Sequence, residues 1–265
     1  MSTNPQEPTN NPGDIRSWPV LQVRYPTDPD KIAALLPPGI EPSDESNVIL
    51  GFYQVPVPDE PENGLMLSVD ANYRGVKGEY TIAYAIDQEA AVYMSTDMTG
   101  QPKYLADVEY YRLGDSVRAR CSHQRYTFAE FKGSATGEVT KPASVEDRHE
   151  WWVKVLPAVE TEKQYDFPPH VVTVITGFEP VAHQEVRGEL ILRDSPWDPI
   201  TQLLPQRGDC SAALITNKMT KREIQLADPI DPEAFAPHLE TISSSRWPGV
   251  LGGPQREVDF TTFLT

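Results

Sequence analysis

The sequence predicts a large, predominantly antiparallel β-sheet or barrel with few helices. About a dozen short segments alternate apolar and polar residues or form short apolar runs, and turn residues separate them. The 26 prolines are scattered along the chain, and no internal repeat is present. A chain of 265 residues can bury a substantial core, and by length alone it could form one large domain or two smaller ones.

The N-terminal half begins with a polar segment rich in Asn and Pro, for which we expect a disordered or subunit-contacting arm over residues 1–14. Thr27 or Asp28 can cap a short helix that starts at Pro29 and ends before Pro37. A second helix is predicted over residues 89–98. The strands predicted in this half span residues 17–25, 47–57, 66–73 and 79–86.

The second half of the chain continues the β pattern. The Val-Val-Thr-Val-Ile run from Val171 fits a buried strand. Short helices are expected over residues 197–204 and 232–239. The predicted strands span residues 106–113, 116–126, 127–137, 150–155, 171–178, 184–193, 210–222 and 224–227.

The charge balance restricts the classes of partner. Against 23 Lys and Arg stand 39 Asp and Glu, which gives a formal net charge of −16. Such a surface repels nucleic acid and anionic membranes, so we expect neither as a partner. No apolar run approaches the roughly 20 residues that span a bilayer, and the first residues carry no apolar signal core. We therefore expect a cytoplasmic protein.

Motifs for metals and nucleotide cofactors are missing from the sequence. The two cysteines, Cys121 and Cys210, lie far apart and lack Cys-x-x-Cys spacing. The five histidines show no His-x-His or His-Glu-x-x-His spacing. No Gly-rich phosphate-binding loop follows a predicted strand. We expect no metal and no cofactor.

One lysine, Lys103, is presented in a defined direction. It follows Pro102, which fixes its own φ and biases Gln101 toward an extended conformation. Taken alone, a lysine after a proline turn is typical of a solvated surface. The stretch around it gives it more weight: Gly75-Val76-Lys77-Gly78-Glu79-Tyr80, then Asp87, Ala90-Ala91, and finally Gly100-Gln101-Pro102-Lys103-Tyr104-Leu105.

These residues and their spacing resemble the core of the acetoacetate decarboxylase superfamily, without a gap from Gly75 to Leu105. Weaker similarity covers most of the chain. The resemblance implies a β-barrel-like α+β fold, a single domain over residues 15–265 and a homo-oligomer. It also implies that Lys103 forms a Schiff base with a ketone substrate.

A lysine suits this chemistry because its iminium ion is an electron sink for carbanion formation. The amine must be neutral to attack, and a lysine with the ordinary pKa of about 10.4 is almost fully protonated at pH 7. A pKa lower by about 3 to 4 units is required, which burial and a neighbouring cation can supply. Acetoacetate decarboxylase is itself a standard example of such an activated lysine.

The sequence departs from the family pattern around this lysine. Tyr104 stands where a second lysine is common. An ungapped alignment puts Trp18 at the position of the family's arginine, and Gly51 and Gly64 at the positions of two glutamates. Arg16 and Glu62 each lie two residues away and are candidates to replace the missing groups.

Three further residues are candidates for the site. Glu79 lies on the motif strand and could move protons, although a solvated turn carboxylate is an alternative. Gln101 is close enough to Lys103 to hydrogen-bond a substrate oxygen. Tyr104 could act as an acid or base, or cover the pocket.

Three functions remain open from the sequence. The chain keeps the lysine but lacks the arginine and the two glutamates of the family's decarboxylases at the aligned positions. This combination favours an enzyme that condenses a pyruvate-type 2-oxo acid with an aldehyde and dehydrates the product, or catalyses the reverse reaction. A decarboxylase that releases CO2 from an acetoacetate-type β-keto acid is the second hypothesis. A non-catalytic relative that binds a small ligand is the third.

Overall fold

The computed structural model describes residues 19–57, 60–160 and 162–254. The predicted N-terminal arm lies outside these residues, and the single-domain organisation remains a prediction. The first half of the chain forms β1 (Val20–Pro26), α1 (Pro29–Leu35), β2 (Glu41–Pro42), β3 (Asn47–Val57), β4 (Glu60–Tyr73), β5 (Val76–Ile86), α2 (Glu89–Thr99) and β6 (Lys103–Leu105). The second half forms β7 (Asp107–Leu113), β8 (Ser116–His123), β9 (Tyr126–Ala135), β10 (Arg148–Pro157), β11 (Tyr165–Leu192), α3 (Ile200–Leu203), β12 (Ser211–Pro229), α4 (Pro232–Phe235) and η1 (Ala236–His238).

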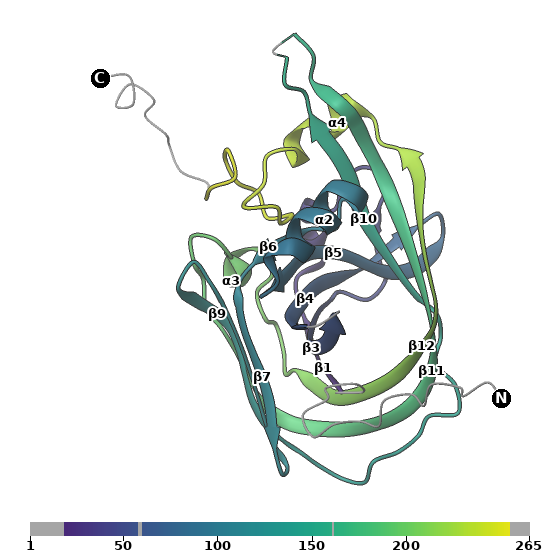
Figure 1. The fold of residues 1–265 in the computed structure, drawn as a ribbon, viewed down its shortest axis with the longest axis vertical. Coiled ribbons are helices and arrows are strands. Elements are labelled where there is room, and N and C mark those ends of the chain that lie inside the picture. The colour runs from purple at the N-terminus through teal and green to yellow at the C-terminus, as the bar shows by residue number, and fades with distance from the viewer. Residues whose placement is uncertain (1–18, 58–59, 161, 255–265) are drawn as a thin grey trace, which may run out of the picture.

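The strands form one sheet whose larger part closes on itself. The order β10-β5-β4-β3-β1-β12-β11 becomes a ring because β10 also pairs with β11. Strands β9, β8 and β7 extend the sheet from β11. Figure 1 shows β7 and β9 on the opposite side of the molecule from β10. All pairings are antiparallel except those of β5 with β6 and with β10, so the predicted α+β, predominantly antiparallel fold with few helices is confirmed.

Two long strands replace what the sequence suggested were four shorter ones. The predicted break between residues 178 and 184 is a continuous part of β11, and the break after residue 222 is a continuous part of β12. The pairing of these strands shifts register near Gly177 and Pro180. Such bulges bend a strand without ending its pairing. The turn-forming residues at these bulges therefore resemble the end of a strand in the sequence, although the strand continues through them. Both strands curve along the same edge of the molecule (Figure 1).

The predicted first helix is confirmed as α1, with Pro29 in its first turn. Asp28 occupies the N-cap position, but its carboxylate makes no capping hydrogen bond. It accepts hydrogen bonds from Arg207 instead. The expected cap is therefore replaced by an ion pair to a distant loop.

Among residues 19–57, 60–160 and 162–254, none of the helices has both the length and the apolar composition that a membrane-spanning helix requires.

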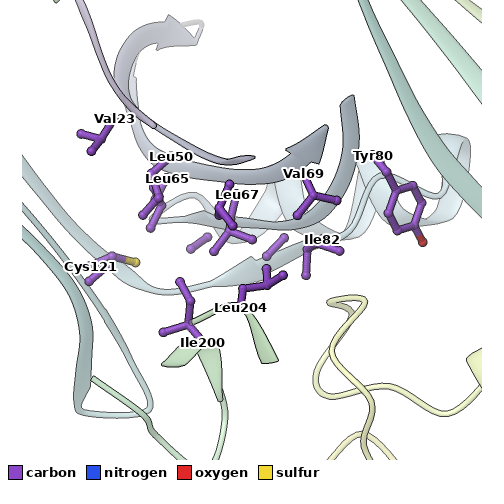
Figure 2. Packing of buried hydrophobic residues seen from close by; sticks show 14 of the residues in the cluster. Val23, Leu50, Leu65, Leu67, Val69, Tyr80, Ile82, Cys121, Ile200 and Leu204 are labelled. Atoms are coloured by element: carbon purple, nitrogen blue, oxygen red, sulfur yellow. The ribbon is translucent and has the colours of Figure 1, made fainter. Parts of the chain in front are cut away.

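The curled sheet buries side chains on both faces. The larger core lies between the ring strands, β7 to β9 and the short helices. In Figure 2, Ile200 and Leu204 lie across this core from Leu65 and Leu67. The opposite face carries a smaller cluster drawn from ring strands alone. We call this surface the Trp152 face and define it by Ile49, Met66, Tyr84, Trp152, Val172 and Val174.

The motif glycine Gly78 has a packing role at the point where β10 closes the ring. Its backbone passes so close to β10 that a Cβ would lie 2.4 Å from the His149 carbonyl oxygen and 2.7 Å from the Trp151 ring. The next residue along, Glu79, pairs with Glu150 across the two strands. A glycine at this position therefore permits the β5–β10 contact that completes the ring.

We predict that Gly78→Ala lowers the free energy of unfolding by about 1–3 kcal/mol, because the added methyl group must push two strands apart. Urea unfolding followed by circular dichroism measures this change. Gly51→Ala serves as the matched control, since a Cβ there meets Met66 and Val20 at ordinary contact distances of 3.4 and 3.7 Å. Equal stability of the two variants would contradict this account of the ring closure.

Candidate active site

Lys103 is placed by the way in which α2 ends. Gly100 follows the helix with a φ of +72°, and its amide donates to the Thr96 carbonyl at 3.0 Å. A Cβ at Gly100 would lie 2.5 Å from the Val153 carbonyl oxygen. The left-handed conformation and the close approach to β10 both require glycine at this position. The helix end is thereby fixed against the strand that closes the ring.

The following residues turn the chain into a short strand beside β5. The Pro102 carbonyl accepts a hydrogen bond from the Tyr84 amide at 2.7 Å, and Lys103 is paired with Tyr84 across the two parallel strands. Paired residues point to the same face of a sheet. Lys103 therefore lies on the Trp152 face, whereas Tyr104 points to the opposite face.

The Lys103 ammonium is buried and paired with Glu62 of β4. Its Nζ lies 3.2 Å from Oε2 and 3.5 Å from Oε1, and the two side chains are 10 % and 6 % exposed. Taking either charge out of water alone would be costly, so each compensates the burial of the other. The pair places a proton acceptor directly beside the amine.

Glu62 is held from its other side by Tyr53 of β3. The Tyr53 hydroxyl donates to Glu62 Oε1 at 2.8 Å. Burial and then the Glu62 charge raise the pKa of Tyr53 well above its ordinary value. The phenol therefore stays protonated and is a permanent hydrogen-bond donor to the carboxylate.

A second polar cluster occupies the same face around Arg148 of β10. Arg148 lies 3.1 Å from Glu79 and 3.5 Å from Glu150. The Glu150 carboxylate also accepts hydrogen bonds from Thr81, Trp152 and Tyr84, the last at 2.8 Å. Burial by itself would raise the pKa of Glu150, but Arg148 and these hydrogen bonds hold it below its ordinary value. Glu150 thus stays ionised, and Arg148 is paired with the carboxylates of both Glu79 and Glu150.

The structure brings together some of the residues predicted from the sequence. Lys103 and Glu62 form a direct pair, and Gln101 is buried in the turn that precedes the lysine. Glu79 lies on the same face but binds Arg148 and Ser68. Arg16 lies outside the described residues.

Tyr104 has a different environment from Lys103. Its hydroxyl donates to Asp198 at 2.5 Å, and Asp198 also bonds His123 Nδ1 at 2.7 Å. The three side chains are buried in the larger core, where the Tyr104 and His123 rings lie 4.2 Å apart. This cluster anchors β6 from the side that faces away from the lysine.

Sequence reasoning missed Tyr53, Tyr84, Arg148 and Glu150. Arg148, Glu150 and Trp152 are spaced by two along β10, which is the signal that they share a face. The sequence could reveal this alternation but not which distant strand faces it. Among residues 19–57, 60–160 and 162–254, no group of three or more His, Cys, Asp or Glu side chains is arranged to hold a metal ion.

The sequence matches a known protein family and two of its curated members. The sequence model described as acetoacetate decarboxylase (ADC) matches residues 1–229. Acetoacetate decarboxylases of Paraburkholderia phytofirmans and Paraburkholderia xenovorans are each 31 % identical over 93 residues, which is 33 % of this chain and 35 % of each relative. The matched region thus spans about a third of the length of these curated relatives.

Solved structures share the fold. An acetoacetate decarboxylase from Legionella pneumophila aligns with a TM-score of 0.67 and 17 % identity over 86 % of this chain and 99 % of its own. An acetoacetate decarboxylase-like enzyme from Sphingomonas wittichii aligns at 0.63 and 15 % identity over 79 % and 91 %. The enduracididine biosynthesis enzyme MppR, complexed with the condensation product of pyruvate and imidazole 4-carboxaldehyde, aligns at 0.60 and 17 % identity over 78 % and 86 %.

The family's sequence model covers most of the chain, and it includes the turn that delivers Lys103 and the strand that carries Glu62. The fold of the solved relatives agrees with this match. The chain therefore belongs to the acetoacetate decarboxylase family.

Proposed function

We propose that this protein is a cofactor-independent lyase in which Lys103 forms a Schiff base with a small oxo acid. We further propose that it condenses and dehydrates a pyruvate-type 2-oxo acid with an aldehyde, or catalyses the reverse. The observation that carries the proposal is the buried Lys103–Glu62 pair on the family's Pro-Lys turn.

Glu62 supplies the proton acceptor that this chemistry needs. It takes a proton from the Lys103 ammonium, and the neutral amine attacks the ketone carbon to give a carbinolamine. Return of a proton to the hydroxyl group releases water and leaves the iminium ion. Loss of a proton from the neighbouring carbon then gives an enamine, which attacks the aldehyde carbon while the aldehyde oxygen takes up a proton and becomes a hydroxyl group. Loss of a second proton from the attacking carbon expels this hydroxyl group as water, and hydrolysis of the imine by water releases the product and regenerates the lysine.

Departures from the family's decarboxylase pattern support condensation over decarboxylation, while Glu62 keeps one carboxylate beside the lysine. Gly51 and Gly64 stand at the two positions where the family pattern has glutamates, and Tyr104 replaces the second lysine. MppR, which shares the fold, is known in complex with a pyruvate condensation product. Decarboxylation of a β-keto acid is the second candidate, because the matching family and both curated relatives carry that name.

The carboxylate of an oxo acid needs a cation, and Arg222 of β12 is our candidate. Arg148, Thr176 and Arg222 form one row across three neighbouring strands, so both arginines share the face of Lys103. Arg148 is already bound to two carboxylates. Arg222 lies over the Trp152 ring, with its Cζ 5.9 Å from the ring centroid, and makes no ion pair within the described ranges.

We also propose that the protein forms a homo-oligomer, takes an aldehyde as its second substrate and works in the cytoplasm. The 39 acidic residues still argue against nucleic acid and anionic membranes as partners.

We predict that borohydride reduction in the presence of pyruvate yields a covalent adduct on Lys103, identified by peptide mass spectrometry. Lys103→Ala abolishes the adduct because the amine is gone, and Lys103→Arg abolishes it while keeping the charge beside Glu62. Acetoacetate, tested in parallel with detection of CO2, separates the two reactions. Absence of an adduct with either ketone from pH 5 to 9 would remove the basis of the proposal.

We predict that Glu62→Gln slows borohydride trapping by about 100-fold, the lower end of what a positioned acid–base group contributes. The amide cannot accept the ammonium proton, although it preserves the shape of the side chain. Trapping rates at saturating pyruvate measure the effect. Glu138→Gln, at an exposed glutamate, is the control and keeps the wild-type rate. Equal rates in the two variants would exclude Glu62 as the proton acceptor.

We predict that Arg222→Gln raises the half-saturating concentration of pyruvate in the trapping assay roughly tenfold, the effect of losing one charge-assisted hydrogen bond. Trapping with acetone, a ketone without a carboxylate, stays unchanged. A similar loss with both ketones would show that Arg222 supports the structure rather than the substrate carboxylate.

A further inference from the structure

On the same side of the sheet as the Trp152 face, the position of the Tyr53 ring depends on a glycine, Gly64. Tyr53 of β3 is paired with Gly64 of β4, and the tyrosine ring lies directly over the glycine. A Cβ at Gly64 would lie 2.2 Å from Tyr53 Cζ, 2.4 Å from its hydroxyl oxygen and 2.7 Å from Cε1. Any side chain at this position would displace the ring. Gly64 has no left-handed φ to explain its presence, so the explanation is space.

The absence of a side chain at Gly64 lets the Tyr53 ring lie over β4 and bring its hydroxyl group to Glu62. Residues 62 and 64 lie on the same face of β4, since side chains alternate along a strand. The ring that covers Gly64 therefore extends toward Glu62, where its hydroxyl binds Oε1 at 2.8 Å. The other carboxylate oxygen, Oε2, is left to face Lys103 Nζ at 3.2 Å.

We infer that Tyr53 is a positioning residue that holds one oxygen of Glu62 so that the other serves Lys103, and that Gly64 is the space this tyrosine requires. The inference rests on the proposed imine chemistry and extends it to two residues outside the lysine motif.

The consequence for Lys103 follows from the geometry of a carboxylate. With Oε1 engaged by Tyr53, Glu62 faces the ammonium mainly through a single oxygen. Without that hydrogen bond both oxygens are free to close on Nζ, which strengthens the ion pair and stabilises the charged amine. Less neutral amine would then be present at a given pH. Because burial and the Glu62 charge raise the pKa of Tyr53, the phenol remains a donor across the pH range of 5 to 9 used for trapping.

The arrangement also accounts for a departure from the family pattern. Gly64 stands where an ungapped alignment expects a glutamate. In this chain a tyrosine from the neighbouring strand fills the space above that position, and the carboxylate comes from two residues earlier on the same face. A carboxylate is thus kept beside the lysine, with a phenol as its new partner.

The test is the pH dependence of borohydride trapping of pyruvate on Lys103 in the full chain. Tyr53→Phe removes only the hydroxyl and is expected to move the pH of half-maximal trapping rate upward by about one unit, the size of one hydrogen bond to a charged group. Gly64→Ala is expected to give the same shift, because the added methyl group forces the ring away from Glu62. The double variant is expected to shift no further than Tyr53→Phe alone, since both changes break one hydrogen bond.

Gly51→Ala is the matched control, because a Cβ there makes only ordinary contacts on the same face. Its profile stays at the wild-type position, and unfolding midpoints verify that each variant is folded. A wild-type adduct with unshifted profiles in Tyr53→Phe would overturn the positioning role alone, as would additive shifts in the double variant. A wild type that forms no adduct would overturn the proposed function, and this inference with it.

Discussion

The burial of one ammonium group beside one carboxylate is the constraint on which the rest of the site depends. Lys103 can leave water only because Glu62 is 3.2 Å away, and Glu62 reaches it only because β4 and β6 both flank β5. The short β6 strand is fixed in turn by the glycine that ends α2 against β10. A charge pair of this kind does not stabilise a protein by much in net terms, since desolvation offsets attraction. A buried pair of this kind therefore fits the proposed function of Lys103 better than a purely stabilising role.

The three-residue strand β6 directs Lys103 and Tyr104 to opposite faces of the sheet, because successive side chains alternate along a strand. Lys103 faces a group of carboxylates, phenols and arginines, whereas Tyr104 faces the Asp198–His123 pair in the larger core. The core cluster fixes the strand through buried hydrogen bonds that water cannot replace. The position and direction of the lysine are therefore fixed by residues in the larger core, on the face of the sheet opposite to the Lys103–Glu62 pair.

Much of the fold was accessible from the sequence, because short alternating segments and turn residues are local signals. The ends of β3 and the existence of α1 and α2 followed from them, whereas the continuity of β11 did not, since a bulge at Pro180 resembles a turn. At the candidate site, the motif pointed to Lys103 and the ungapped alignment pointed to Glu62, and the structure places these two side chains in one buried ion pair. Tyr53 and Glu150 escaped because their roles come from strand pairing over long separations, which one sequence does not reveal. The reason is physical: the periodicity of the sequence determines which face of a strand a residue occupies, whereas the order of strands in the sheet determines which other residues lie next to it.

The two-residue offset of Glu62 shows why the face of a strand matters more than its exact alignment. A shift by one residue would have sent the carboxylate into the larger core, but a shift by two keeps it on the Trp152 face and moves it about 7 Å along the strand. The long Lys103 side chain can absorb such a displacement by leaning toward it. Position 64, where the family pattern has the glutamate, carries no side chain in this chain. The Tyr53 ring from the neighbouring strand occupies the space above it. In this chain the lysine thus has a carboxylate partner on the same face of the sheet, and that partner is held by a tyrosine from the neighbouring strand.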